Sequence, residues 1–82
     1  MNEFIYTIKD ENGIHARPAG ILAKKAQAFP FEITVECNGR TASLKKLLAL
    51  MGLGIKKGDT VRVFADKEND ISELKEFFEK TV

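Results

Sequence analysis

The segment over residues 13–20 combines the residue types that phosphoryl chemistry uses. It holds His15, the only histidine of the chain, with Arg17 and Pro18 at close spacing. Within a helix, proline clashes with the carbonyl group four residues earlier and donates no N–H, so a helix that contains Pro18 must begin after Ile14. The sequence therefore predicts His15 at the amino-terminal end of a helix.

The start of a helix suits a histidine that accepts a phosphoryl group. The first backbone N–H groups have no partner inside the helix and the helix dipole is positive there, which favours a bound anion and disfavours an imidazolium. A neutral imidazole is the nucleophilic form, and the rigid guanidinium fork of Arg17 matches phosphate oxygens. We expect His15 and Arg17 to carry the chemistry. The phosphoryl group is expected to lie against Ala16, Arg17 and Pro18.

The alternative is that His15 is a surface or capping residue, which is the usual role of a lone histidine in a small domain. The order histidine, one spacer, arginine, proline and a small residue nevertheless resembles the active-site signature of HPr, the histidine-containing phosphocarrier family of the bacterial phosphoenolpyruvate:sugar phosphotransferase system. The resemblance runs from Phe4 to the final helix without an insertion. It includes residues 44–55, which end in Met51-Gly52-Leu53-Gly54-Ile55.

This resemblance implies a covalent carrier rather than an enzyme with its own turnover. His15 would take a phosphoryl group from the phosphohistidine of Enzyme I and pass it to a histidine of a sugar-specific Enzyme IIA, with no cofactor. A chain of 82 residues without a glycine-rich nucleotide loop agrees with that role.

Alternating and helical patterns predict seven elements in the order strand, helix, strand, strand, helix, strand, helix. Asn38-Gly39 predicts a type I′ hairpin, because both central residues of that turn need positive φ. Such elements pack most simply as an α+β open-faced sandwich, a four-stranded antiparallel sheet with three helices on one face, which the HPr resemblance also implies. The expected elements are strands at residues 4–8, 31–37, 40–42 and 61–65, a helix at 16–28, a short helix after Ser43, and a helix capped by Asn69 or Asp70 with Ile71, Leu74 and Phe78 buried.

The short second helix carries more apolar residues than one buried stripe can hold. Leu44, Leu47, Leu48 and Met51 fit one helical face, so Leu50 must lie elsewhere, and exposed apolar area often marks a docking surface. The alternative is that neighbouring elements cover everything. The HPr resemblance implies a surface, formed with the first helix, that binds successive partners. Its expected residues are Gly20, Ile21, Lys24, Lys45, Leu47, Leu48 and Met51, with Lys24, Lys25, Lys45 and Lys46 as a basic rim for acidic partners.

The chain departs from the family pattern at Lys46. Many HPr proteins of Gram-positive bacteria carry a serine there, which a dedicated kinase phosphorylates. Lysine cannot accept the phosphate and carries the opposite charge, so we expect no regulatory site. Ser43 lies nearby and is interpreted as the cap of the second helix rather than as a phosphoacceptor.

Composition and charge limit the classes of protein to which this chain can belong. The 82 residues allow one domain, over residues 1–82, with a modest core. A net charge of +1 gives no global field for nucleic acid or an anionic membrane. Because Cys37 is the only cysteine, an internal disulfide is excluded. One cysteine and one histidine are also too few ligands for a zinc site. The first residues show neither a signal-peptide pattern nor a spanning segment, which predicts a cytoplasmic protein without membrane insertion, and we expect a monomer.

Two other functions are alternatives to the carrier. An HPr-like regulatory module could control a transcription factor or metabolic enzyme through its phosphorylation state, but His15 and Arg17 argue against pure binding. A nucleic-acid or metal-binding domain would need a strongly basic face with exposed sheet aromatics, or clustered cysteine and histidine. The sequence offers neither, and it leaves open which sugars or pathway the chain serves.

Overall fold

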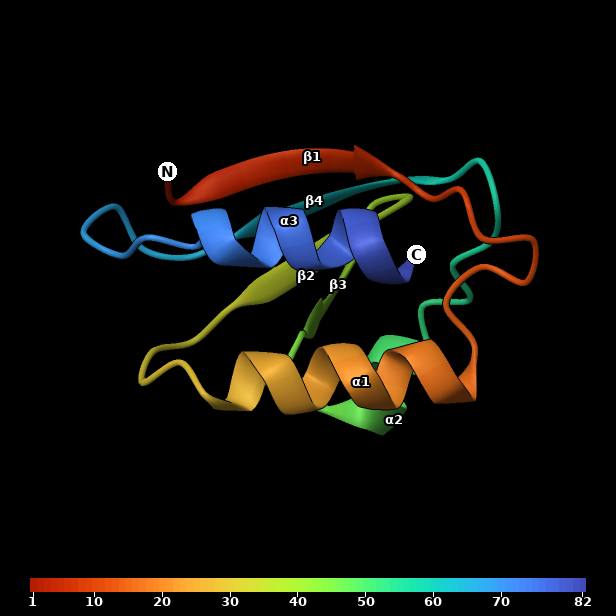
Figure 1. The fold of residues 1–82 in the computed structure, drawn as a ribbon, viewed down its shortest axis with the longest axis horizontal. Coiled ribbons are helices and arrows are strands. Elements are labelled where there is room, and N and C mark those ends of the chain that lie inside the picture. Colours follow the sequence, from red (N-terminus) through yellow and green to blue (C-terminus); the bar gives the residue numbers. More distant parts are fainter.

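The computed structural model describes all residues from Met1 to Val82. Three helices lie on one face of a four-stranded antiparallel sheet, and the strand order is β1-β4-β2-β3 (Figure 1). This is the open-faced sandwich that the sequence predicts. The elements are β1 (Glu3–Thr7), α1 (Ala16–Gln27), β2 (Thr34–Cys37), β3 (Arg40–Ser43), α2 (Leu47–Met51), β4 (Thr60–Phe64) and α3 (Ser72–Thr81).

The strands bury alternate residues on the face that the helices cover. β1 buries Phe4 and Tyr6, and β4 buries Val61 and Val63. The antiparallel register sets Phe4 opposite Val63 and Tyr6 opposite Val61, and β2 sets Val35 opposite Val63 on the other side. The buried residues of neighbouring strands therefore form one continuous apolar layer.

The predicted hairpin between β2 and β3 is confirmed. Asn38 and Gly39 both have positive φ, 53° and 79°, as a type I′ turn requires. β2 begins only at Thr34, later than the alternation predicts; Thr34 lies opposite Ser43, the last residue of β3, and opposite Phe64, the last residue of β4. Phe31 instead packs edge-on against Phe29, with ring centroids 5.6 Å apart.

The long helices bury the predicted stripes. α1 ends at Gln27, one residue before the predicted limit, and buries its small and aliphatic residues Ala19, Leu22, Ala23 and Ala26. In and before α3, Ile71, Leu74 and Phe78 are fully buried. The Phe78 ring meets Phe4 and Tyr6 edge-on at 5.4 and 5.9 Å, which fixes α3 over β1. None of these helices has the length and apolarity that a membrane crossing requires.

The predicted buried stripe of α2 is wrong. Leu50 is fully buried, whereas Leu47, Leu48 and Met51 are 39%, 81% and 36% exposed. The helix is only five residues long and begins at Leu47, so Leu44 is not on a shared helical face with the residues that follow. Leu44 instead follows the last residue of β3 directly and is fully buried there.

The predicted cap of α2 is also wrong. Lys46 occupies the N-cap position, and no side chain caps this helix. Ser43 closes the turn after β3: its Oγ accepts the Lys45 N–H at 3.2 Å and donates to Glu32 Oε1 at 2.7 Å. The Ser43 hydrogen bond lowers the pKa of Glu32, although partial desolvation opposes it.

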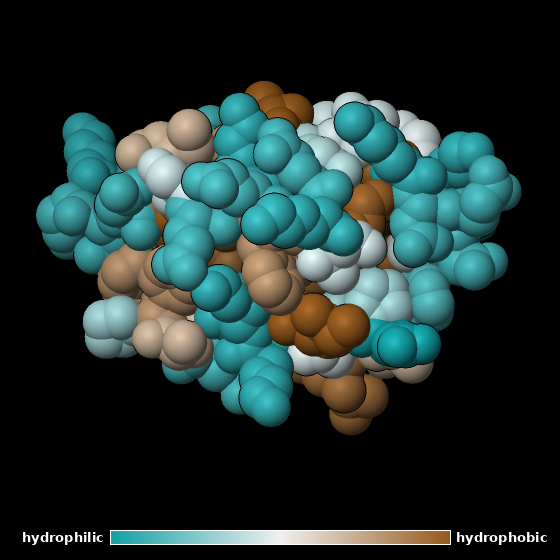
Figure 2. Space-filling model, in the orientation of Figure 1, coloured by the Kyte–Doolittle hydropathy of each residue, from teal (hydrophilic) through white to brown (hydrophobic).

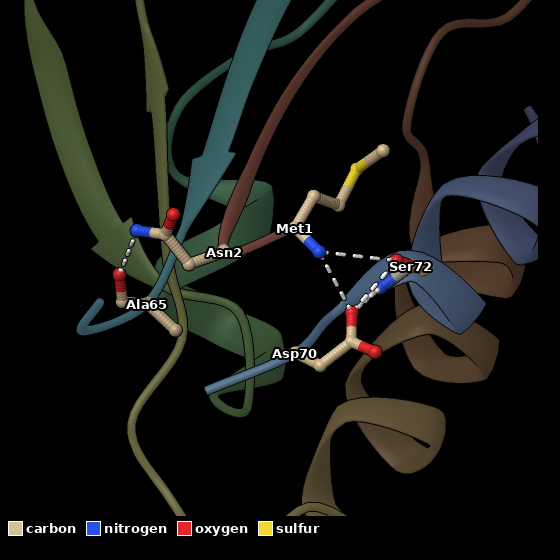
Figure 3. Close-up of polar contacts among 5 residues, drawn as sticks. All are labelled: Met1, Asn2, Ala65, Asp70 and Ser72. Carbon is tan, nitrogen blue, oxygen red and sulfur yellow. Dashed lines mark hydrogen bonds and ion pairs between the residues drawn. The ribbon is translucent and has the colours of Figure 1, made fainter. Parts of the chain in front are cut away.

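At α3 the predicted cap is displaced by one residue. Ile71 occupies the N-cap position, while Asp70 Oδ1 accepts hydrogen bonds from the Ser72 N–H at 3.0 Å and from Ser72 Oγ at 2.7 Å. The Met1 amino group also reaches this oxygen, at 3.1 Å, and Asn2 Nδ2 donates to the Ala65 carbonyl nearby (Figure 3). The hydrogen bonds that Asp70 accepts from Ser72, above all, and from the Met1 amino group lower the pKa of Asp70 to about 2.

Candidate functional site

His15 occupies the N-cap position of α1, as the position of Pro18 predicts. Its backbone is extended, with φ −95° and ψ −173°, and its carbonyl accepts the N–H of Ala19 at 2.9 Å. The imidazole is exposed and makes no hydrogen bond to the helix that it begins. His15 therefore marks a helix start without using its side chain to cap it.

The first turn of α1 leaves backbone donors free. Ala16 and Arg17 are the first two helical residues, so their N–H groups have no acceptor one turn earlier, and Pro18 has no N–H to satisfy. No side chain of the chain reaches them either. Two backbone donors and the positive end of the helix dipole are thus directed at the space beside His15.

The loop that delivers the chain to His15 is closed against the segment after α2. Gly13 has φ +65°, and a side chain there would collide with the Ile55 carbonyl oxygen and lie 2.7 Å from Lys56 Cα. The next residue, Ile14, is buried and donates its N–H to the Ile55 carbonyl at 3.0 Å. Glycine at position 13 is required by this close approach as well as by its positive φ, and no local pattern in the sequence indicates the close approach.

A hollow of about 280 Å³ lies beside His15. Its walls come from three parts of the chain: the loop after β1, the first half of α1 and the last residue of α3. In Figure 1 that loop descends to α1 at the right of the view, on the side where α3 ends. The lining residues are Asp10, His15, Arg17, Pro18, Ile21 and Thr81.

The predicted chemical residues meet in this hollow. Arg17 is exposed and makes neither an ion pair nor a hydrogen bond within the chain, so its guanidinium is free for a ligand. Pro18 lines the hollow beside it, while Ala16 lies outside the wall and offers only its free N–H. An exposed imidazole, an unpaired guanidinium and unpaired backbone donors form a site that could receive a tetrahedral anion at His15.

Sequence reasoning missed two residues of the wall, Asp10 and Thr81. Neither residue is among the site residues that the sequence predicts. They reach the hollow because Val82 O accepts the N–H groups of Lys9 and Asp10, both at 2.8 Å, which brings the end of α3 to the loop. No local pattern in the sequence signals this long-range contact.

The predicted docking residues are brought together on two adjoining helices. Ile21 and Lys24 are exposed on α1, and Gly20 is half-buried beside them. Leu47, Leu48 and Met51 are exposed on α2, which packs against α1. Figure 2 shows hydrophobic surface at the lower edge of the molecule, in the region that α1 and α2 occupy in Figure 1.

The predicted basic rim is only partly free. Lys45 Nζ donates to the Phe29 carbonyl at 2.6 Å, and Lys25 pairs with Glu73 at 2.7 Å. Lys24 and Lys46 are exposed and make no ion pair. Lys24 and Ile21 also border a second hollow, of about 320 Å³, between α1 and Phe77 of α3.

The chain matches known proteins over nearly its whole length. A family model described as the PTS HPr component phosphorylation site matches residues 2–80. Among solved structures, the chain is similar to the histidine-containing phosphocarrier protein of Mycoplasma, with 35% identity over 96% of this chain and 89% of that one and a TM-score of 0.82. HPr from Thermoanaerobacter tengcongensis is 30% identical over 98% of this chain and 89% of that one, with a TM-score of 0.82. HPr from Bacillus anthracis is 26% identical over 98% of this chain and 94% of that one, with a TM-score of 0.82.

Proposed function

The chain belongs to the HPr family of phosphocarrier proteins, and from that premise we propose that His15 accepts a phosphoryl group from Enzyme I and donates it to a sugar-specific Enzyme IIA. The accessibility of the His15 side chain is the observation that supports this proposal most directly. Its imidazole is exposed, free of any internal hydrogen bond, and shares one hollow with an unpaired Arg17.

The chemistry is an exchange of one phosphorus–nitrogen bond for another. A lone pair on a ring nitrogen of neutral His15 attacks phosphorus, while the bond from phosphorus to the donor histidine breaks and its electron pair returns to the donor ring. Each ring keeps the proton on its other nitrogen, so no net proton transfer is needed. In such a transfer the negative charge spreads over three equatorial oxygens. The Arg17 guanidinium and the free N–H groups of Ala16 and Arg17 are suited to hold those oxygens.

Docking would use the surface of α1 and α2. Leu47, Leu48 and Met51 supply apolar contact beside the hollow, and the unpaired charges of Lys24 and Lys46 favour encounter with an acidic partner. An apolar centre with a small basic rim fits brief complexes, which a carrier needs because it must leave one partner before meeting the next.

We expect no regulatory serine phosphorylation at the start of α2. The exposed residue at the N-cap of α2 is Lys46, which has no hydroxyl. The hydroxyl group that precedes it in the chain, Ser43 Oγ, is half-buried and donates its proton to Glu32 Oε1 at 2.7 Å.

The test is incubation with phosphoenolpyruvate and Enzyme I, followed by intact-mass measurement before and after acid treatment. We expect the mass of one added phosphoryl group, lost in acid because phosphohistidine is acid-labile. His15→Ala is the matched variant: it should fold normally, because the His15 side chain makes no capping hydrogen bond, and stay unmodified. Phosphorylation of that variant, or an acid-stable product, would refute the assignment.

A further inference from the structure

Asp10 stands out among the residues of the hollow because three hydrogen bonds fix it in place. Its N–H donates to Val82 O at 2.8 Å, and its carbonyl accepts the Gly13 N–H at 3.0 Å. Its side-chain Oδ1 accepts the Asn12 N–H at 2.8 Å. A residue held at its N–H, its carbonyl and its side chain has little freedom to move its charge away from the wall that it forms with His15 and Arg17.

The charge of Asp10 is not neutralised by a close partner. It forms no ion pair, and its second oxygen, Oδ2, has no hydrogen-bond donor. The neighbouring Glu11 differs in both respects, because it is highly exposed and pairs with Lys57 at 2.7 Å. The hollow beside His15 is therefore lined by one residue with a held negative charge, Asp10, and by one with an unpaired positive charge, Arg17.

We propose that Asp10 tunes how firmly His15 holds the phosphoryl group, an inference that rests on the proposed function. Phosphorylation turns an uncharged side chain into one with net negative charge, since a phosphoryl dianion outweighs the proton on the ring. The Asp10 carboxylate repels that added charge while Arg17 attracts it. Asp10 thus raises the free energy of the phosphorylated state relative to the unphosphorylated one and favours passing the group on.

Asp10→Asn separates this electrostatic role from the structural one. The amide keeps an oxygen that can accept the Asn12 N–H, so the turn is preserved, but the negative charge is lost. Glu11→Gln is the matched control, because it removes one negative charge at the next residue, outside the hollow. Equal unfolding temperatures for wild type and Asp10→Asn would show that the turn is intact.

The experiment measures how one phosphoryl group divides between two chains. Wild type and variant, one of them labelled with ¹⁵N, are mixed with a catalytic amount of Enzyme I and limiting phosphoenolpyruvate until the phosphorylated fractions stop changing, and both fractions are read by intact mass. We expect Asp10→Asn to hold the group about two- to fivefold more strongly than wild type, the range of coupling between partly exposed charges. Glu11→Gln should divide it evenly. The excess should shrink in high salt, which a purely structural effect would not do.

The outcomes distinguish this inference from the function on which it rests. If wild type is never phosphorylated, the proposed function fails and the role of Asp10 fails with it. If wild type is phosphorylated but Asp10→Asn shares the group evenly, or holds less of it, only the role of Asp10 is overturned. An excess that does not change with salt also overturns it.

Discussion

Replacing Gly13 by alanine should destabilise the protein more than the same change at another glycine with the same backbone conformation. Gly54 is the matched control: its φ is +62° against +65° at Gly13, but a side chain at position 54 would have open space around it. The left-handed backbone costs a non-glycine residue about 1–2 kcal/mol, and both variants carry that cost.

Only Gly13→Ala adds a collision. The new methyl group would displace the Ile55 and Lys56 backbone, and with it the hydrogen bond from the Ile14 N–H to the Ile55 carbonyl. Ile14 and Ile55 are 5% and 3% exposed, so the separated groups would have little access to water, at a cost of about 1–3 kcal/mol. The unfolding free energy should therefore fall by about 2–5 kcal/mol at Gly13, against about 1–2 kcal/mol at Gly54.

Thermal unfolding followed by circular dichroism measures both variants. For a domain of this size, 1 kcal/mol corresponds to about 4–8 °C in Tm, so Gly13→Ala should unfold at least about 4 °C below Gly54→Ala. Because His15 follows two residues later, phosphorylation by Enzyme I should also slow in the Gly13 variant while it is still folded. Equal Tm values for the two variants would refute the reasoning that the loop is closed against Ile55.

Three further outcomes are expected. Arg17→Lys should slow phosphoryl transfer more than it weakens Enzyme I binding, since lysine keeps the charge but loses the planar fork; equal losses in transfer kinetics and in titrations would place Arg17 in the interface instead. Met51→Glu should change stability by less than about 1 kcal/mol yet weaken binding, whereas the buried Leu50→Ala should cost about 2–5 kcal/mol; unfolding of the Met51 variant would remove it from the docking surface. The pKa of Asp70 is about 2, against the usual 3.8, so its ionised carboxylate stabilises the fold above pH 4. This contribution should be lost as the pH falls towards 2 and the carboxylate is protonated. Melts of wild type and Asp70→Asn should therefore converge in that range, and a constant gap would contradict this.

Local patterns predicted the elements whose signals are strong and contiguous. Pro18 alone places the start of α1 and therefore His15, and Asn38-Gly39 alone places the hairpin, because each limits the backbone to a few conformations. The periodicity of α3 correctly gave its buried residues.

The sequence was a poorer guide where the chain changes direction. Five helical residues are too few for a period to be read, and so the buried side of α2 was predicted wrongly around Leu50. The wall formed by Asp10 and Thr81 depends on α3 returning to the loop after β1, a contact between residues far apart in sequence. A single sequence contains no local signal for such a contact.

The return of α3 to the first loop has a consequence for folding order. The hollow needs Asp10 from the loop after β1 and Thr81 from α3, with Val82 O joining the two through Lys9 and Asp10. Until α3 has docked, α1 can be helical and His15 exposed, but one wall is missing and the loop is not held. Contacts this distant in sequence require closure of a long loop, which makes them slow to form. A partly folded chain would therefore carry the reactive histidine without its complete surroundings. The ability of His15 to accept a phosphoryl group would then indicate that the whole fold has formed.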